Sequence, residues 1–301
     1  MKIKDGIVGL IIGDALGVPF EFNTREELEI NPVTDMEGYG TYNMPPGTWS
    51  DDSSMTIATM SSIVNKEAID YDDLMNEFLS WIEEGKYTQY EKTFDYGSTT
   101  AQGLFNYKRG VEPLLCGGDG ERNNGNGSLM RILPLAFIPN INYKTVENVS
   151  ALTHRHERSR IACVYYIEIA KSMISNDLTI DEHINLASEK IKAIYNSCEE
   201  LNHFSRIYNN DITDVKSSGY VVDTLESVMH CLKTTDSYKS AVLKAVNLGG
   251  DTDTVAAICG GLAGIYYGFD AIPIDWIESI PHINHVLELC EKFEVVCDEY
   301  L

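Results

Sequence analysis

The stretch Asn247-Leu248-Gly249-Gly250-Asp251-Thr252-Asp253-Thr254 stands at the predicted start of a helix, because an apolar run with helical spacing follows it at residues 255–265. Side-chain oxygens of Asp and Thr accept hydrogen bonds from the free N–H groups of a helix N-terminus. One such residue is enough for capping, whereas Asp251, Asp253 and Thr254 together offer a surplus of oxygen ligands. A surplus of this kind suits a hard cation such as Mg²⁺, Mn²⁺ or Ca²⁺. The alternative interpretation is an ordinary acidic helix start after a glycine turn.

A second stretch of the same character, Gly47-Thr48-Trp49-Ser50-Asp51-Asp52-Ser53, lies about 200 residues earlier in the chain. It follows a Pro-Pro-Gly turn and precedes a helical run at residues 55–64. Adjacent carboxylates repel each other unless a cation lies between them. Two helix starts of this kind can converge on one site, which favours a metal site over two separate helix caps.

Two known aspartate motifs do not fit these residues. A calcium EF-hand loop needs Gly at its sixth position and Glu at its twelfth. Counted from Asp251, those positions hold Ala256 and Leu262. A phosphotransferring DxDxT motif needs Thr where Val255 stands, and no strand is evident before it. Both motifs are therefore excluded.

The overall composition limits the classes of ligand. The chain has 301 residues, of which 44% are hydrophobic, and its net charge is −23. This length and apolar content suffice for a sizeable core. The negative charge repels a phosphate backbone, so nucleic-acid binding is not expected, and the acidity is explained most simply by solubility. An anionic ligand would need local groups such as helix N-termini, loop amides or a metal ion.

The cysteines and the N-terminal segment indicate a cytoplasmic protein. The seven cysteines are odd in number, scattered, and form no CxxC pair, which is typical of reduced and mostly buried thiols. An apolar run at residues 6–12 is too short to span a bilayer and lacks a signal-peptide cleavage pattern. We therefore expect no membrane segment. An acidic surface without an obvious apolar stripe favours a monomer.

Apolar residues at helical spacing predict an all-α protein with one compact multi-helix domain over residues 1–301. Gly6, Gly9, Gly13 and Gly17 share one face of the first helix, an arrangement that makes sense where another backbone approaches closely. Residues 23–47 and 200–213 are predicted to be irregular connections. The predicted helices cover residues 3–17, 53–65, 71–85, 95–110, 143–153, 157–175, 180–196, 214–232, 237–247, 251–267 and 283–296, with a helix-like pattern at 129–137.

Four polar features have more than one interpretation. Glu21 is either a solvated loop residue or part of a site, and Asp95 is either an N-cap or an acid near the metal site. The Gly- and Asn-rich segment 116–128 matches neither GxGxxG nor a P-loop, so it is a phosphate-holding loop or a plain surface loop. His154 and His156 could bind a metal, cap a helix or contact a ligand; the lack of a nearby Cys or a third spaced His argues against a transition metal.

Five motifs, in one order and spacing over residues 5–268, carry a family resemblance. They lie at residues 13–21, 48–53, 124–131, 153–154 and 249–254. Each motif alone is weak, but the five in register are specific. Together they resemble the ADP-ribosylglycohydrolase family, and within it the branch of the bacterial dinitrogenase-reductase-activating glycohydrolases.

This resemblance implies a compact all-α fold with two divalent metal ions, Mg²⁺ or Mn²⁺, in a cleft. It also implies three groups of site residues by motif position. The metal ligands would be Ser50, Asp51, Asp52, Asp251, Asp253 and Thr254. The substrate-binding residues would be Asn124, Gly125, Asn126, Gly127, Ser128 and His154. The candidate catalytic carboxylates would be Asp52, Asp95 and Glu21, and the resemblance does not choose among them.

The implied activity is the removal of mono-ADP-ribose from a protein side chain, with arginine as the expected acceptor. Glycosidic cleavage passes through a cationic state at the anomeric carbon. Two metal ions can orient the ribose and activate water, and a carboxylate can move the proton. Serine-linked or small-molecule ADP-ribosyl substrates are alternatives within this class, so the partner is an ADP-ribosylated protein or an ADP-ribosyl small molecule. A non-catalytic ADP-ribose-binding module and a metal-dependent nucleotide phosphohydrolase are alternatives from other classes.

Overall fold

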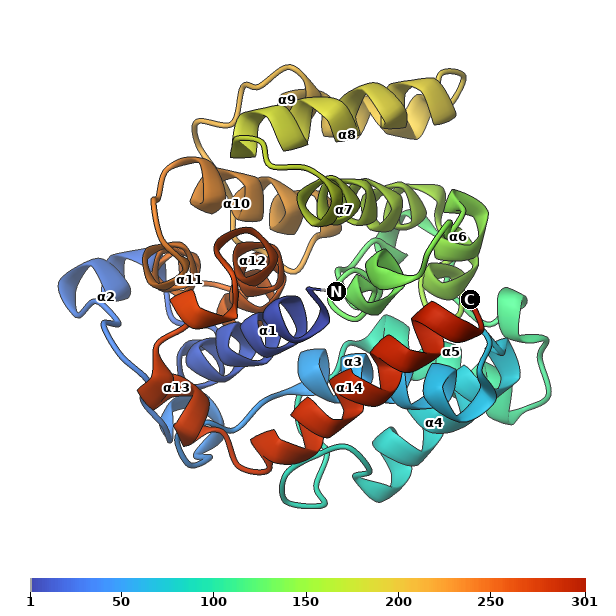
Figure 1. Cartoon of the computed structure of the whole chain (residues 1–301), viewed down its shortest axis with the longest axis horizontal. Helices are drawn as coiled ribbons and strands as arrows, with labels where there is room; N and C mark the ends of the chain where they lie inside the picture. Colours follow the sequence, from blue (N-terminus) through green and yellow to red (C-terminus); the bar gives the residue numbers. More distant parts are fainter. Residues whose placement is uncertain (1) are drawn as a thin grey trace.

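Two glycine-rich helices, α1 (Ile3–Gly17) and α12 (Thr252–Tyr267), pack side by side near the centre of the molecule (Figure 1). Almost every residue of both helices is buried, as expected for helices that are apolar all round. Their backbones touch, because a Cβ atom at Gly9 would lie 2.3 Å from the carbonyl oxygen of Gly260. A Cβ atom at Gly13 would lie 2.0 Å from the carbonyl oxygen of Ala256. The glycine face of the first helix is therefore the surface on which α12 packs.

The computed structural model describes residues 2–301, and in that range it contains fourteen α-helices, seven 3₁₀ helices and no β-strand. The predicted all-α fold is confirmed. The other α-helices are α2 (Arg25–Ile30), α3 (Asp51–Lys66), α4 (Tyr71–Glu84), α5 (Ser98–Lys108), α6 (Tyr143–Ala151), α7 (Glu157–Ser175), α8 (Ile180–Ile194), α9 (Ser205–Tyr208), α10 (Val221–Lys233), α11 (Tyr238–Asn247), α13 (Ile274–Ser279) and α14 (Ile283–Glu299). The 3₁₀ helices are η1 (Val18–Phe20), η2 (Gly40–Tyr42), η3 (Pro113–Leu115), η4 (Glu121–Asn123), η5 (Leu133–Phe137), η6 (Glu199–Phe204) and η7 (Phe269–Ala271).

The remaining helices surround the central pair in two groups (Figure 1). Helices α3 and α14 pack against α1, and α4 and α5 extend this group outward from α3. Helices α7, α10 and α11 pack against α12, and α8 and α9 extend the second group outward from α7. One continuous hydrophobic core runs through both groups. The N-termini of α3 and α12 are thereby held close to the C-terminal end of α1.

The predicted helix boundaries are wrong where tertiary contacts compete with the helical pattern. Helix α5 begins at Ser98 rather than at residue 95, because Asp95 has a φ of 51°. Helix α10 begins at Val221 rather than at residue 214, and Ser217 of the preceding segment instead accepts a hydrogen bond from the N–H of Asp251. Residues 129–137 form turns and the short helix η5 in place of the expected α-helical run.

The two segments predicted as irregular connections contain short helices. Helix α2 lies within residues 23–47, where Thr24 and Glu27 form a reciprocal capping box. Helices η6 and α9 lie within residues 200–213. All seven cysteines are free, and all except the partly exposed Cys198 are buried. Among the helices of residues 2–301, none combines the length and the apolar character needed to cross a membrane.

Candidate functional site

The two acidic stretches meet at adjacent helix N-termini. Helix α3 begins at Asp51 and helix α12 at Thr252, and the hydroxyl of Thr254 donates to Asp52 Oδ2 at 3.3 Å. The hydroxyl of Ser50 donates to the same oxygen at 2.9 Å. Both helix starts consequently contribute oxygen atoms to one cluster, although they lie about 200 residues apart in the chain.

Asp14, which is not among the predicted site residues, holds the start of α3 in place through hydrogen bonds. Its carboxylate accepts hydrogen bonds from the N–H of Ser50 at 3.0 Å and from the N–H of Ser53 at 3.0 Å. The oxygens of Asp14, Asp52 and Asp253 lie within 4.8 Å of one another, and all three residues are buried. The sequence signal for Asp14 is a carboxylate that follows the apolar run at residues 6–12 of α1, where a buried charge is rarely tolerated without partners.

A second carboxylate group joins the cluster from the loops. The oxygens of Glu21, Asp95 and Asp253 also lie within 4.8 Å of one another. Glu21 is only 6% exposed, so the solvated-surface interpretation of this residue is wrong. The hydroxyl of Tyr42, at the end of η2, donates to Glu21 Oε2. Tyr42 was missed because it lies in a segment predicted to be an irregular loop.

Crowding raises the pKa of these carboxylates. Burial, followed by repulsion from neighbouring carboxylates, raises the pKa of Asp51, Asp52 and Asp253 well above the usual range. Burial and the nearby Asp95 raise the pKa of Glu21 to about 8. Burial raises the pKa of Asp14 to about 6, against the lowering effect of its serine hydrogen bonds. The cluster thus holds more negative charge than its surroundings neutralise.

Two buried oxygens of the cluster are left without partners. Asp52 Oδ1 and Asp253 Oδ2 are inaccessible to solvent and accept no hydrogen bond from the described residues. A buried acceptor without a partner is costly, and a buried carboxylate oxygen more so. The donor set consists of carboxylate and hydroxyl oxygens, the ligands preferred by Mg²⁺ and Mn²⁺. The residues present therefore fit divalent metal ions of that class.

The cluster opens into a cavity of about 520 Å³. Its lining combines residues of the acidic cluster with residues of the Gly- and Asn-rich loop and its neighbours. Arg122, which sequence analysis did not single out, adds a positive charge to the lining. The predicted site residues that line this cavity are Glu21, Asp51, Asp95, Asp251, Thr254, Gly125, Asn126, Gly127 and His154.

The other predicted site residues lie behind the cavity wall. Asp52, Asp253 and Ser50 form the buried part of the acidic cluster. The side chain of Asn124 accepts a hydrogen bond from Ser159, and the side chain of Ser128 accepts one from Ser150. Asn124 and Ser128 therefore shape the loop from within the protein and do not line the cavity.

The loop is joined directly to the acidic cluster. The amide Nδ2 of Asn126 donates to Asp251 Oδ2 at 2.8 Å and to the hydroxyl of Thr224 at 2.9 Å. The backbone N–H of Asn126 donates to the carbonyl of Gly219 at 3.0 Å. Asn126 thus links the loop, the start of α10 and the start of α12.

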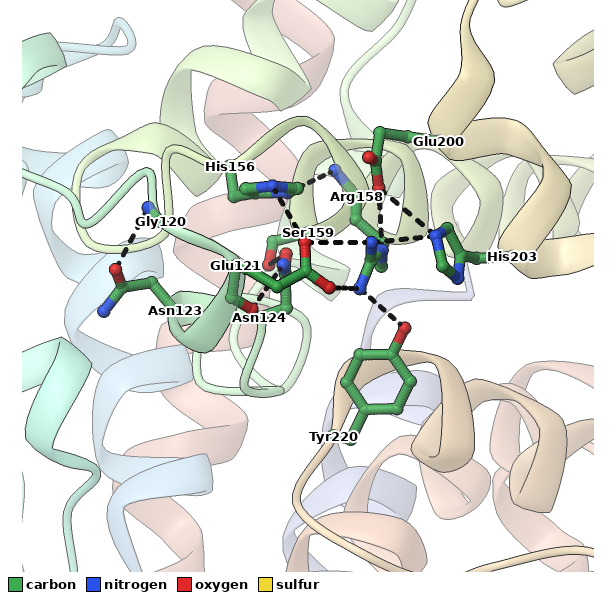
Figure 2. A network of polar contacts seen from close by, with 10 residues as sticks. All are labelled: Gly120, Glu121, Asn123, Asn124, His156, Arg158, Ser159, Glu200, His203 and Tyr220. Carbon is green, nitrogen blue, oxygen red and sulfur yellow. Dashed lines mark hydrogen bonds and ion pairs between the residues drawn. The ribbon is translucent and has the colours of Figure 1, made fainter.

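A polar network centred on Arg158 anchors the outer end of the same loop (Figure 2). The guanidinium is 4% exposed and donates to Glu121 Oε1 at 2.8 Å, to Glu200 Oε2 at 2.8 Å and to the hydroxyl of Tyr220 at 3.0 Å. Figure 2 shows it pointing between η4, η6 and the start of α10. Arg158 therefore fastens the loop that begins at Glu121 to the segment that ends at Tyr220.

The network also shows that His156 caps a helix. His156 Nδ1 accepts the backbone N–H of Arg158 at 3.2 Å, while His154 lines the cavity. The oxygens of Glu121 and Glu200 lie near His156 in a group that could in principle hold a metal. The guanidinium of Arg158 already bonds both carboxylates, so this place is occupied by a cation of the protein itself.

A crowded cluster of carboxylate and hydroxyl oxygens beside a cavity is a candidate site for binding divalent cations together with a ligand. Comparison with known sequences defines the class further. The sequence pattern of the ADP-ribosylglycohydrolase family matches residues 1–300, and the chain belongs to this family. The resemblance inferred from the five motifs is confirmed, and the chain is a glycohydrolase.

Named relatives are similar to the protein over nearly its whole length. The ADP-ribosylarginine hydrolase Tri1 of Serratia proteamaculans is 29% identical over 99% of this chain and 80% of its own length. The ADP-ribosyl-[dinitrogen reductase] glycohydrolase of Rhodospirillum rubrum is 31% identical over 91% of this chain and 88% of its own length. A solved ADP-ribosylglycohydrolase-related protein complex has the same fold, with a TM-score of 0.84, 24% identity, and 98% of both chains covered.

Proposed function

We propose that the protein hydrolyses the bond between ADP-ribose and an arginine side chain of a modified protein. The observation that carries this proposal is the buried carboxylate cluster with two unpartnered oxygens beside a cavity of about 520 Å³. Arginine as the acceptor is supported by the name of the Serratia relative. It is also supported by the acidic cavity wall, which suits both a cationic sugar and a guanidinium leaving group.

The proposed metal ligands are the six residues inferred from the motifs. Ser50, Asp51 and Asp52 come from the start of α3, and Asp251, Asp253 and Thr254 come from the start of α12. Two Mg²⁺ or Mn²⁺ ions bound there would offset the carboxylate charge, orient the ribose hydroxyls and make water more acidic. The crowding that raises the carboxylate pKa values supports this assignment, because bound cations relieve it.

Glu21 and Asp95 are the proposed proton carriers, because both line the cavity. The hydroxyl of Tyr42 donates to Glu21 and fixes its carboxylate beside the cavity, within reach of a proton in a bound substrate or water. Asp52 is fully buried behind them and does not line the cavity, so we assign it to metal binding rather than to proton transfer. This choice narrows the three catalytic candidates to two.

The part of the cavity lined by the Gly- and Asn-rich loop is proposed to bind the ADP-ribosyl group. Gly125, Gly127 and His154 line this part of the cavity, and the backbone N–H groups of the two glycines and the imidazole would supply hydrogen-bond donors to the anionic part of such a ligand. Arg122 supplies the positive charge that a diphosphate requires in a chain of net charge −23. Asn124 and Ser128 act by shaping this loop. The free cysteines are consistent with the expected cytoplasmic location, and a monomer stays a prediction.

The test is ADP-ribose release from an arginine-ADP-ribosylated protein with Mg²⁺ or Mn²⁺, with EDTA, and with Asp251→Ala. Asp275→Ala is the matched control, because Asp275 is exposed on α13 and does not line the cavity. Release that is abolished by EDTA and by Asp251→Ala, and kept by Asp275→Ala, supports the proposal.

Other outcomes assign the site differently. Release from serine-linked or free ADP-ribosyl substrates but not from arginine contradicts the acceptor. Tight ADP-ribose binding without turnover at any metal indicates a binding module, and phosphate release indicates a phosphohydrolase.

A further inference from the structure

One ring nitrogen of His154 faces the cavity without a protein partner. His154 is 2% exposed and lines the cavity. Its Nδ1 lies 2.9 Å from Thr153 Oγ1, and its Nε2 has no hydrogen bond to any of the described residues. The ring packs on the glycines of the loop, since a Cβ atom at Gly127 would lie 3.3 Å from Nε2 and one at Gly125 would lie 3.6 Å from it. Nε2 is therefore the atom that His154 presents to a ligand.

The direction of each hydrogen bond behind the ring follows from Arg131. Arginine only donates, so Thr153 Oγ1 accepts the N–H of Arg131 at 2.9 Å. The hydroxyl proton of Thr153 then has Nδ1 of His154 as its acceptor. In the reverse arrangement, two N–H donors would converge on one oxygen, and the fully buried hydroxyl proton would have no acceptor. The arrangement that satisfies every group leaves Nδ1 as an acceptor and places the ring proton on Nε2.

The burial of the charged Arg131 side chain is energetically unfavourable, which suggests that the residue has a role beyond packing. It is 0% exposed, its Nε and one terminal nitrogen have no hydrogen-bond partner, and no carboxylate of residues 2–301 forms an ion pair with it. The guanidinium lies 4.6 Å from the centre of the Phe78 ring, which compensates part of its lost hydration. Burial and then the charge of Arg131 lower the pKa of His154 to about 3. The imidazole is therefore neutral as well as fixed in orientation.

We propose that Arg131 and Thr153 are positioning residues that hold His154 as the neutral Nε2–H form, so that it donates one hydrogen bond to an oxygen of the ADP-ribosyl ligand. This inference rests on the proposed function for the identity of the ligand. A neutral donor binds an oxygen without adding positive charge to a cavity in which a cationic sugar must form. The proton position itself is a property of the ligand-free protein.

The first test reads the proton position directly. Long-range ¹H–¹⁵N correlation spectra of ¹⁵N-histidine-labelled protein distinguish the two neutral forms from the protonated ring, and His154→Phe assigns the signal. In the wild type we expect a single neutral form with the proton on Nε2. Thr153→Val keeps the shape but removes the hydroxyl, and it is expected to give a mixture of forms. Thr153→Ser restores the hydroxyl and the wild-type signal.

The second test reads the consequence for the ligand. Calorimetry with ADP-ribose and Mg²⁺ is expected to show binding about 5- to 20-fold weaker for Thr153→Val, the loss of one well-placed hydrogen bond. Thr153→Ser is expected to bind within about twofold of the wild type. Arg131→Met, which keeps the volume without the charge, is measured in the same two ways if Thr153→Val does not fold, and it is expected to give mixed forms and weaker binding.

The outcomes separate this inference from the proposed function. A wild-type proton on Nδ1, a protonated ring, or unchanged spectra and affinity in a folded Thr153→Val protein would overturn it. The spectra need neither ligand nor turnover. A wild-type protein without hydrolase activity would therefore contradict the proposed function but would not affect the inferred position of the ring proton. A wild type that does not bind ADP-ribose would overturn the ligand contact.

Discussion

The carboxylate of Asp14, near the end of α1, accepts hydrogen bonds from both the backbone N–H of Ser53 at 3.0 Å and its hydroxyl at 2.5 Å. It also accepts the N–H of Ser50. A helix start normally takes its acceptor from its own N-cap side chain. Here an acceptor from another helix performs much of that role, so the geometry of Asp51 and Asp52 depends on the packing of α1 against α3.

Asp14→Ala is expected to destabilise the protein and to disturb the acidic cluster together. Three buried donors lose their acceptor, and we expect the free energy of unfolding in urea to fall by about 3 kcal/mol. Ser53→Ala is the matched comparison, because it removes the hydroxyl but keeps the N–H, and it should lose about 1 kcal/mol. Equal effects of the two changes would contradict the assigned role of Asp14.

Asp253→Asn is expected to change stability in opposite directions with and without metal. In EDTA the change removes one of the crowded charges, and the melting temperature should rise. With Mg²⁺ or Mn²⁺ the wild type should gain stability and the variant should gain little, while ADP-ribose release should fall at least about 100-fold. Differential scanning calorimetry with and without metal measures the first two effects. A variant that metal stabilises as much as the wild type would remove Asp253 from the ligands.

The stability of the metal-free protein is expected to fall as the pH rises from about 6.5 to 8.5. The pKa of Glu21 is raised to about 8 in the folded state, so its folded carboxyl holds a proton in this window that the unfolded chain has lost. The pKa values of Asp51, Asp52 and Asp253 are raised in the same direction. Such groups contribute stability below their unfolded pKa and lose it as the pH passes the folded pKa, by up to about 1.4 kcal/mol per pH unit for each group. Urea titrations in EDTA measure the slope. Saturating Mg²⁺ should flatten it, and a metal-free slope of the opposite sign would contradict the raised pKa values.

Gly9→Ala is expected to be severely destabilising. The added carbon would lie 2.3 Å from a backbone oxygen of α12, which only a shift of one whole helix can relieve. Overpacking of this kind should lower the free energy of unfolding by about 3 kcal/mol or more. Gly97→Ala is the control, because its added carbon would meet nothing closer than 4.0 Å. A Gly9→Ala protein as stable as the control would disprove backbone contact between α1 and α12.

Arg158→Met is expected to weaken ligand binding more than it slows the reaction. The change releases the loop from Glu121 and Tyr220 but touches none of the acidic cluster. We expect KM for an ADP-ribosylated substrate to rise about 10-fold while kcat stays within about threefold of the wild-type value, since the proposed loop contacts would serve bound substrate and transition state alike. Arg109→Met, at an exposed arginine bonded to Asn106, is the control. A fall in kcat with unchanged KM would place Arg158 in the chemistry instead.

Local periodicity predicted most of the fold because most helices carry their own apolar face. The boundaries of α4 and α7 agree with the predicted ranges to within one residue. The start of α10 could not be predicted in the same way, because the residues before Val221 accept backbone hydrogen bonds from Asn126 and Asp251 in distant parts of the chain. Long-range hydrogen bonds that compete with helix formation cannot be recognised from the local spacing of apolar residues.

The site was predictable where its chemistry is concentrated in short motifs. Asp51, Asp52, Asp251 and Asp253 stand out as surplus carboxylates, and the structure brings them together. Residues that act through a single long-range contact were not predictable. Arg131 closes the motif at residues 124–131, but its contact with Thr153 depends on the folded chain and is not encoded in local spacing.

The contact between α1 and α12 has a consequence for biosynthesis. More than 230 residues separate the end of α1 from the start of α12. At the usual rate of translation, α12 is synthesised about 10 to 50 s after α1. Throughout that time the apolar, glycine-notched face of α1 has no α12 to cover it, and half of the acidic cluster does not exist. A prematurely terminated chain thus lacks the complete site and exposes the surface that chaperones and proteases recognise.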